Sequence, residues 1–140
     1  MNLVVDASVA LKWFFRERAD EAEVQPALEI LQGYIEGRHG LLQPWHFQVE
    51  MCAVLARESP ALMRENLRDL LALSMPTRDD EIVLWRAMQL SSQLGHHLFD
   101  TLYHAVALET DDSVLVTADE TYCRKARGLG RVTPLSAWSQ

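Results

Sequence analysis

Two short apolar runs stand out in the pattern of hydrophobic and polar residues, and each leads to an aspartate. Residues 3–5 (Leu-Val-Val) precede Asp6, and residues 113–117 (Ser-Val-Leu-Val-Thr) come just before Asp119. Unbroken apolar runs rich in β-branched residues are typical of strands buried on both faces of a parallel sheet. The carboxyl ends of such strands share one edge of the sheet, where open α/β sheets bind their ligands. The sequence therefore predicts that Asp6 and Asp119 lie close together.

Amphipathic helices are predicted between these strands. Apolar spacing, capping residues and breakers place them at residues 7–15, 26–36, 45–58, 61–73, 81–94, 101–108 and 120–126. Short strands are expected at residues 41–42 and 132–134, with a further edge strand at 74–76. Strands that alternate with helices indicate an α/β fold. We therefore expect one domain over residues 1–140, a three-layer α/β/α sandwich around a short, mainly parallel sheet.

Composition and charge narrow the function classes. The chain has 13 basic and 20 acidic residues, a formal net charge of −7. This balance argues against a protein that holds nucleic acid through a broad positive surface, but it is compatible with a nuclease that gathers acids in one cleft. The sequence shows no apolar span of membrane length and no signal peptide, and Cys52 and Cys123 have no metal-type spacing. A cytoplasmic protein with reduced thiols is expected.

Two further acids can join Asp6 and Asp119. Glu50 lies at the border of the apolar face of its predicted helix, where a carboxylate needs a cation, a metal or a proton. Asp100 is predicted to be the N-cap of the helix at residues 101–108. Four carboxylates in one pocket raise one another's pKa values, and bound Mg²⁺ or Mn²⁺ removes that penalty. Such a cluster suits metal-assisted hydrolysis of a phosphodiester.

Four stretches resemble the motifs of one known family. Residues 4–14 (VVDASVALKWF) look like the opening of PIN-domain proteins, particularly the small VapC-type toxins of bacterial toxin–antitoxin pairs. Residues 44–50 resemble their second motif, residues 100–105 (DTLYHA) the third, and residues 116–120 (VTADE) the fourth. The four motifs occur in order over the full length. The chain departs from the pattern at Ala53, where the family often has Asn.

The resemblance implies an activity, a cofactor and partners. It implies an endoribonuclease that depends on Mg²⁺ or Mn²⁺, is inhibited by a cognate antitoxin protein and is usually a homodimer. By position, Asp6, Glu50, Asp100 and Asp119 match the acidic quartet, and Thr117 matches a supporting hydroxyl residue. Asp6, Asp100 and Asp119 would hold the principal metal, while Glu50 would shape the site and orient water.

Several neighbouring residues have both a structural and a functional interpretation. Ser8 is predicted to cap the first helix and to hydrogen-bond near the metals. The basic cluster of Arg124, Lys125, Arg127 and Arg131 fits either a solvated helix end or phosphate contacts beside the cleft. His104 is expected to be structural or to flank the substrate, and His96 and His97 are expected in an exposed loop.

Two other functions remain open from the sequence. The chain could be a catalytically silent PIN-fold module that binds RNA or a regulatory protein partner. It could also be a phosphatase with Asp6 as its nucleophile. Phosphatases of that kind typically have a second acid two residues later, where this chain has Ser8.

Overall fold

A four-stranded parallel sheet lies at the centre of the molecule. The computed structural model describes residues 1–139; Gln140, the last residue of the predicted domain, lies outside the described part. The strands are β1 (Asn2–Val5), β2 (Gly40–Leu41), β3 (Ser113–Thr117) and β4 (Val132–Pro134), in the order β2-β1-β3-β4. Every pairing is parallel, and Val5 of β1 lies opposite Val116 of β3. The ends of β1 and β3 therefore bring Asp6 and Asp119 to the same edge.

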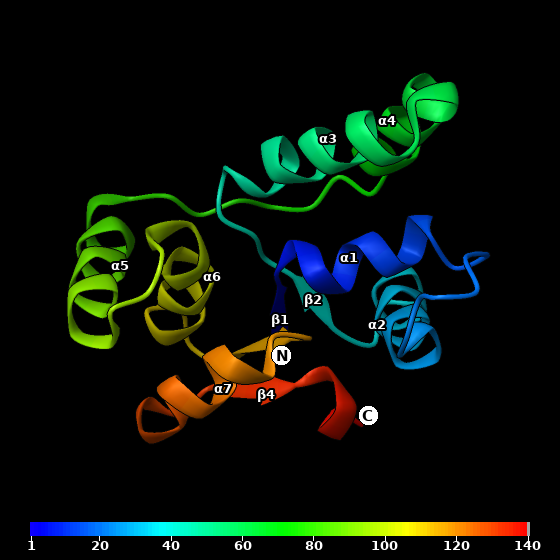
Figure 1. Cartoon of the computed structure of the whole chain (residues 1–140). Coiled ribbons are helices and arrows are strands. Elements are labelled where there is room, and N and C mark those ends of the chain that lie inside the picture. The colour runs from blue at the N-terminus through cyan, green and yellow to red at the C-terminus, as the bar shows by residue number, and fades with distance from the viewer. Residues whose placement is uncertain (140) are drawn as a thin grey trace.

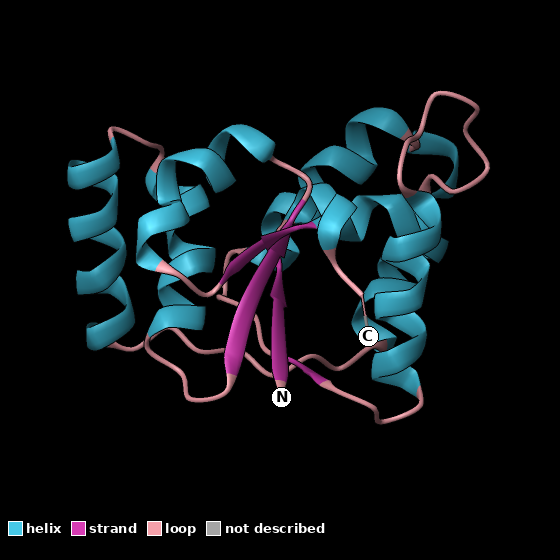
Figure 2. Cartoon of the chain, turned by 90° about the horizontal axis from the view of Figure 1, so that it is seen from below, coloured by secondary structure: helices cyan, strands magenta, loops and turns pink. Residues whose placement is uncertain are grey.

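Seven α-helices surround this sheet in the described residues. They are α1 (Ala7–Phe14), α2 (Val24–Ile35), α3 (Phe47–Glu58), α4 (Met63–Ala72), α5 (Glu81–Leu94), α6 (Leu98–Leu108) and α7 (Glu120–Ala126). Short 3₁₀ turns follow at η1 (Pro60–Leu62), η2 (Arg127–Leu129) and η3 (Leu135–Ala137). Helices α5 and α6 lie on one side of the sheet and α1 and α2 on the other (Figures 1 and 2). The predicted α/β/α sandwich is confirmed.

The first strand is the most deeply buried part of the sheet. Leu3, Val4 and Val5 are at most 1% exposed, and they pack in one core with Val9 of α1 and Leu115 of β3. Burial on both faces explains the unbroken apolar run, since neither face of the strand meets water. The strand thereby holds the backbone of Asp6 rigidly.

The Gln43 side chain extends the sheet beyond the short strand β2. Its amide Nε2 donates to the carbonyl of Val5 (2.6 Å), and its Oε1 accepts from the Val5 N–H (2.9 Å). Gln43 is only 1% exposed, so these are buried hydrogen bonds. They satisfy the backbone of the residue that immediately precedes Asp6, where β2 has already ended.

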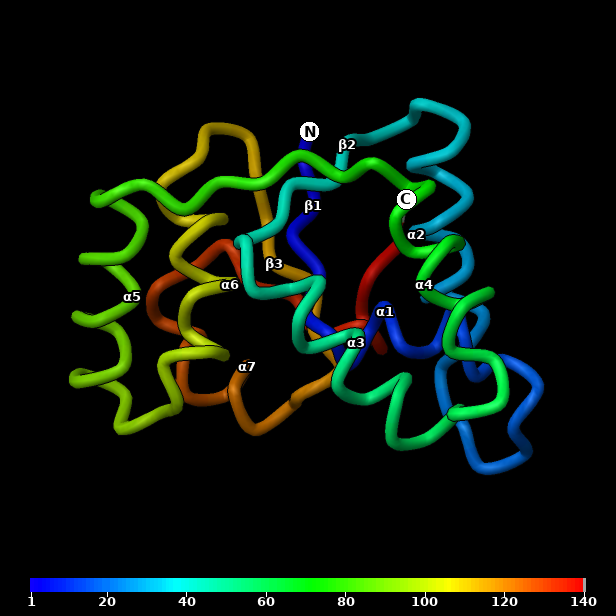
Figure 3. The backbone as a smooth tube through the Cα atoms, turned by 90° about the horizontal axis from the view of Figure 1, so that it is seen from above, coloured from blue at the N-terminus to red at the C-terminus, as the bar shows by residue number. Residues whose placement is uncertain are grey.

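Helices α3 and α4 form a pair that extends away from the sheet. The pair lies above the other helices in Figure 1, and α3 runs between α1 and α6 in the view from above (Figure 3). The first turn of α3 reaches α6 directly, because the Nε2 atom of His46 lies 2.9 Å from the carbonyl oxygen of Phe99. The position of Glu50 in this turn is thereby fixed.

Several predicted boundaries differ from the structure, most by one or two residues. The segment at residues 74–76 is not a strand: Ser74 has a positive φ, and only a single bridge joins Gln43 to Thr77. The helix that contains Asp100 begins at Leu98, three residues earlier than predicted, with His97 as its N-cap. Helix α3 begins at Phe47 rather than Trp45. In the described residues, no helix is both long enough and apolar enough to cross a membrane.

Candidate metal centre

Asp6 lies at the carboxyl end of β1 and accepts two hydrogen bonds from hydroxyl groups. Ser8 donates to its Oδ1 and Thr117 to its Oδ2, each at 2.5 Å. Burial raises the pKa of the Asp6 carboxyl from 3.8 to about 6; the two hydroxyl donors lower it, and the nearby charge of Asp100 raises it further. A carboxylate in this setting gains stability when a cation neutralises it.

Thr117 and Ser8 connect the ends of the two central strands. The Thr117 hydroxyl donates to Asp6 and accepts from the Asp119 N–H (3.0 Å), while the Ser8 Oγ accepts from the Ala118 N–H (3.2 Å). Ser8 was predicted to cap α1, and this is wrong: α1 begins at Ala7, and the hydroxyl bonds across to β3. The backbone of the two strand ends is therefore held by these hydroxyl groups.

Asp100 and Asp119 meet beside Asp6, together with a histidine. Ligand atoms of His96, Asp100 and Asp119 all lie within 4.8 Å of one another. Asp119 also caps α7, since its Oδ1 accepts from the Tyr122 N–H (3.0 Å). The Asp119 side chain therefore caps α7 and also belongs to the acid group.

The prediction that Asp100 is an N-cap is wrong. His97 occupies the cap position with non-helical backbone, so Asp100 belongs to the first turn of α6. Because the helix begins earlier than predicted, the Asp100 carboxylate faces His96, whose Nε2 lies 2.9 Å from Asp100 Oδ2. The expectation of an exposed loop is also wrong for His96, whose side chain is 13% exposed; His97 is exposed as predicted.

Glu50 comes from α3 and is held by two aromatic side chains. The buried Tyr103 hydroxyl donates to Glu50 Oε1 (2.8 Å), and His46 Nε2 lies 2.8 Å from the same oxygen. Glu50 and Asp100 share a surface hollow, whose lining is Trp45, His46, Val49, Glu50, Ala53, His97, Phe99 and Asp100. Glu50 therefore lies at the edge of the acid group, about one third exposed (33%).

The basic cluster divides into two parts. Arg124, Lys125 and Arg127 are exposed, and Lys125 Nζ lies 3.2 Å from His96 Nδ1, beside the acids. Arg131 instead donates to the carbonyls of Ala107 and Thr110 at the end of α6, so its role is structural.

His104 is a structural residue. It is fully buried, with its Nδ1 2.8 Å from the Tyr122 hydroxyl and its Nε2 2.9 Å from the Gly130 carbonyl. Burial lowers the pKa of its imidazole, while the Gly130 carbonyl raises it and Arg86 lowers it further.

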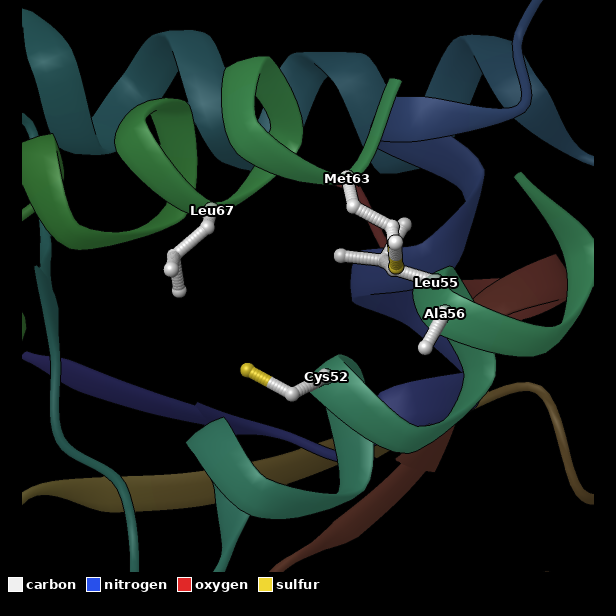
Figure 4. Close-up of a pocket in the computed structure, with 5 residues that line it drawn as sticks. All are labelled: Cys52, Leu55, Ala56, Met63 and Leu67. Carbon is white, nitrogen blue, oxygen red and sulfur yellow. The ribbon is translucent and has the colours of Figure 1, made fainter. Parts of the chain in front are cut away.

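A second hollow lies between α3 and α4 and has a different character. Its lining is Cys52, Leu55, Ala56, Met63 and Leu67, with the side chains pointing into a common space (Figure 4). It contains no carboxylate, so it offers no ligands for a hard cation. Cys52 and Cys123 are both free thiols, as expected.

Sequence reasoning missed His96, Tyr103 and His46. Each stands at helical spacing from a predicted acid: His96 is four residues before Asp100, Tyr103 three after it, and His46 four before Glu50. Residues three and four apart share a helix face. That spacing was the available signal, although in the structure His46 and His96 lie just before α3 and α6 rather than within them.

The donor set fits a hard divalent cation. Asp100 and Asp119 offer carboxylate oxygens within 4.8 Å of each other, and the charge of Asp100 acts on Asp6 nearby. Such oxygens are the ligands that Mg²⁺ and Mn²⁺ prefer. Burial raises the pKa of the Asp6 carboxyl to about 6, with a smaller contribution from the charge of Asp100, and a nearby cation would favour its ionised form.

Comparison with known proteins identifies the family. The family model described as the PIN domain matches residues 3–128. The chain belongs to the PIN domain family. PIN domains are generally nucleases that bind metal through acidic residues. In this chain Asp100 and Asp119, together with His96, form a group that could hold a metal ion. None of the curated proteins compared with the chain matches it.

Proposed function

We propose that this PIN-domain protein is an endoribonuclease that requires Mg²⁺ or Mn²⁺. The observation that carries the proposal is the meeting of Asp6, Asp100 and Asp119 at one edge of the sheet. Asp6 is tied to the Asp119 backbone through Thr117, and Asp100 and Asp119 offer ligand atoms within 4.8 Å of each other. Three separate parts of the chain supply these acids. If the acids served only as helix caps, they would have no reason to lie close together.

Each acid has a role in this proposal. Asp6, Asp100 and Asp119 hold the cation, and Glu50 orients the attacking water with its carboxylate fixed by Tyr103. The bound cation lowers the pKa of water and stabilises charge on the phosphate and the leaving oxygen. Ser8 and Thr117 keep Asp6 in one orientation through their hydrogen bonds.

Aromatic and basic side chains around the acids support a single-stranded RNA substrate. Trp45 and Phe99 are 51% and 52% exposed, and both line the hollow that contains Glu50 and Asp100. Unpaired bases stack on exposed aromatic rings, and phosphates bind Arg and Lys. Arg124, Lys125 and Arg127 are exposed on and after α7, on another side of the acid group.

The resemblance to VapC-type toxins supports a cellular role. We propose a cytoplasmic toxin that is held inactive by an antitoxin protein and that forms a homodimer. Large apolar side chains on two helices support protein partners: Ile82, Trp85 and Met88 of α5 are 55–60% exposed, and the apolar hollow of Figure 4 lies open between α3 and α4. Growth arrest on expression, relieved by Asp6→Asn, would support the toxin role.

Cleavage of RNA by the purified protein tests the activity. Single-stranded RNA is incubated with Mn²⁺ and either the wild type, Asp6→Asn or Asp119→Asn. Asp69→Asn is the matched control, because Asp69 is an exposed acid on α4. We expect cleavage by the wild type and the control only. Equal cleavage by all four proteins would refute the assignment, and RNA that is bound in EDTA but never cut with metal would favour a silent binding module.

A further inference from the structure

A lysine, a histidine and an aspartate form a continuous chain of contacts at the metal centre. Lys125 Nζ lies 3.2 Å from His96 Nδ1, and His96 Nε2 lies 2.9 Å from Asp100 Oδ2. The three residues come from α7, the turn before α6, and α6 itself. The contacts therefore join two separate elements at the acid group.

The chemistry of lysine fixes the proton on the imidazole. An ammonium group has only hydrogens to donate, so His96 Nδ1 must accept from Lys125 with its lone pair. A neutral imidazole then carries its hydrogen on Nε2, and that N–H donates to Asp100 Oδ2. In this arrangement Nε2 has no free lone pair, so His96 cannot coordinate a cation.

The surroundings hold the His96 ring in this orientation. Its side chain is 13% exposed, and the ring packs edge-on against Tyr122, with centroids 4.9 Å apart. The Ser91 hydroxyl of α5 donates to the His96 carbonyl (2.6 Å), which fixes the backbone as well. A donor held from several sides is a feature of residues that orient metal ligands.

We propose that His96 is a positioning residue that holds Asp100 for the cation. Its Nε2–H occupies Oδ2 and stops the carboxylate from rotating, so Oδ1 stays available for metal near Asp119. Lys125 acts one step further away, by keeping the hydrogen on Nε2. The inference rests on the proposed metal-dependent function and adds to it two residues that the acidic quartet does not include.

Mn²⁺ binding, measured by calorimetry without RNA, tests the proposal. We expect His96→Ala to weaken Mn²⁺ binding by about 10- to 100-fold, the usual cost of losing a residue that orients a metal ligand. His96→Gln, whose amide can donate from a similar position, should stay within about threefold of the wild type. Gln93→Ala is the control, since Gln93 is an exposed residue of α5 that belongs neither to the acid group nor to the hollow beside Glu50, and the affinity should not change.

Pulsed electron paramagnetic resonance of the Mn²⁺-loaded wild type distinguishes positioning from ligation. We expect no nitrogen coupling from a coordinated imidazole, a readout that needs no variant to fold. A nitrogen coupling that disappears in His96→Gln would make His96 a ligand and overturn the proposal. Wild-type affinity in a folded His96→Ala would also overturn it.

The outcomes separate this inference from the proposed function. If the wild type binds Mn²⁺ and Asp119→Asn does not, the metal centre stands, and the His96 variants decide the positioning role alone. If the wild type binds no Mn²⁺ at neutral pH, both the metal-dependent function and this inference fail.

Discussion

The Asp6 carboxyl links stability to pH in the metal-free protein. Its pKa is about 6 in the folded state and 3.8 when unperturbed. Between these values the folded state keeps the proton and the unfolded state loses it, so raising the pH through this window lowers the free energy of unfolding. Below pH 6 protons also compete with a cation for this carboxylate.

We expect Asp6→Asn to remove this pH dependence. In EDTA, the wild type should lose on the order of 2 kcal/mol of stability from this group between pH 4 and pH 7, while the variant should not. Urea unfolding of both proteins at several pH values measures the difference. Parallel profiles for the two proteins would contradict the raised pKa of Asp6.

The Tyr103 hydroxyl provides a second test at the residue scale. Tyr103→Phe removes the donor to Glu50 Oε1 and leaves the buried ring in place. We expect RNA cleavage at saturating Mn²⁺ to slow by about tenfold, because a freely rotating Glu50 orients water poorly. Tyr34→Phe is the control, since the Tyr34 hydroxyl bonds the distant Leu73 carbonyl. Equal cleavage rates for all three proteins would show that the orientation of Glu50 does not affect RNA cleavage.

Strand-borne residues were easier to predict than helix-borne ones. Asp6 and Asp119 follow apolar runs whose burial fixes where the strands end, so their proximity follows from the parallel sheet alone. The environment of Asp100 depends on a helix that begins three residues earlier than its sequence suggests. The contact of His96 with Lys125 of α7 depends on tertiary packing, which no local pattern contains, whereas its contact with Asp100 is local.

At the scale of elements, β1 depends on a side chain to complete its pairing. Strand β2 ends at Leu41, and the Gln43 amide takes over the hydrogen bonds of the Val5 backbone. Hydrophobic periodicity predicted the strands but not the hydrogen bonds from the Gln43 side chain to the Val5 backbone. A single glutamine between a strand and a helix has no distinctive pattern. The same lack of signal explains the incorrect strand at residues 74–76.

Gln43→Leu should therefore destabilise the protein strongly. It leaves the buried N–H and C=O of Val5 without partners, at a cost of about 2–4 kcal/mol in the free energy of unfolding. Chemical denaturation measures this cost, with the exposed Gln93→Leu as control. A loss below about 0.5 kcal/mol would show that water or a shift of β1 satisfies the Val5 backbone instead.

At the scale of the whole molecule, the net charge of −7 opposes contact with RNA. The basic residues near the acids are few, so in the proposed nuclease a bound cation would offset much of the repulsion between the acidic site and phosphate. The acidic balance read from the sequence is compatible with such a nuclease, whereas the exposed aromatic rings beside Glu50 became apparent only from the fold.

RNA affinity should therefore depend on a divalent cation. For Glu50→Gln, used to suppress cleavage, we expect fluorescence anisotropy to show weak binding in EDTA and about tenfold or tighter binding with Mg²⁺. Trp45→Ala should weaken the Mg²⁺-supported binding by about fivefold or more through lost stacking. Tight binding in EDTA that is unaffected by Trp45→Ala would contradict both expectations.

Asp119 has a structural role as a helix cap and a proposed role as a metal ligand, and this combination affects how the protein can lose its function. Its carboxylate caps α7 through the Tyr122 N–H and also belongs to the acid group. Asparagine is as good a cap as aspartate, but a neutral amide is a poor ligand for a hard cation. If Asp119 holds the cation as proposed, a single Asp-to-Asn change would silence the protein and leave α7 intact. An inactive descendant would then persist as a well-folded protein rather than be removed by degradation.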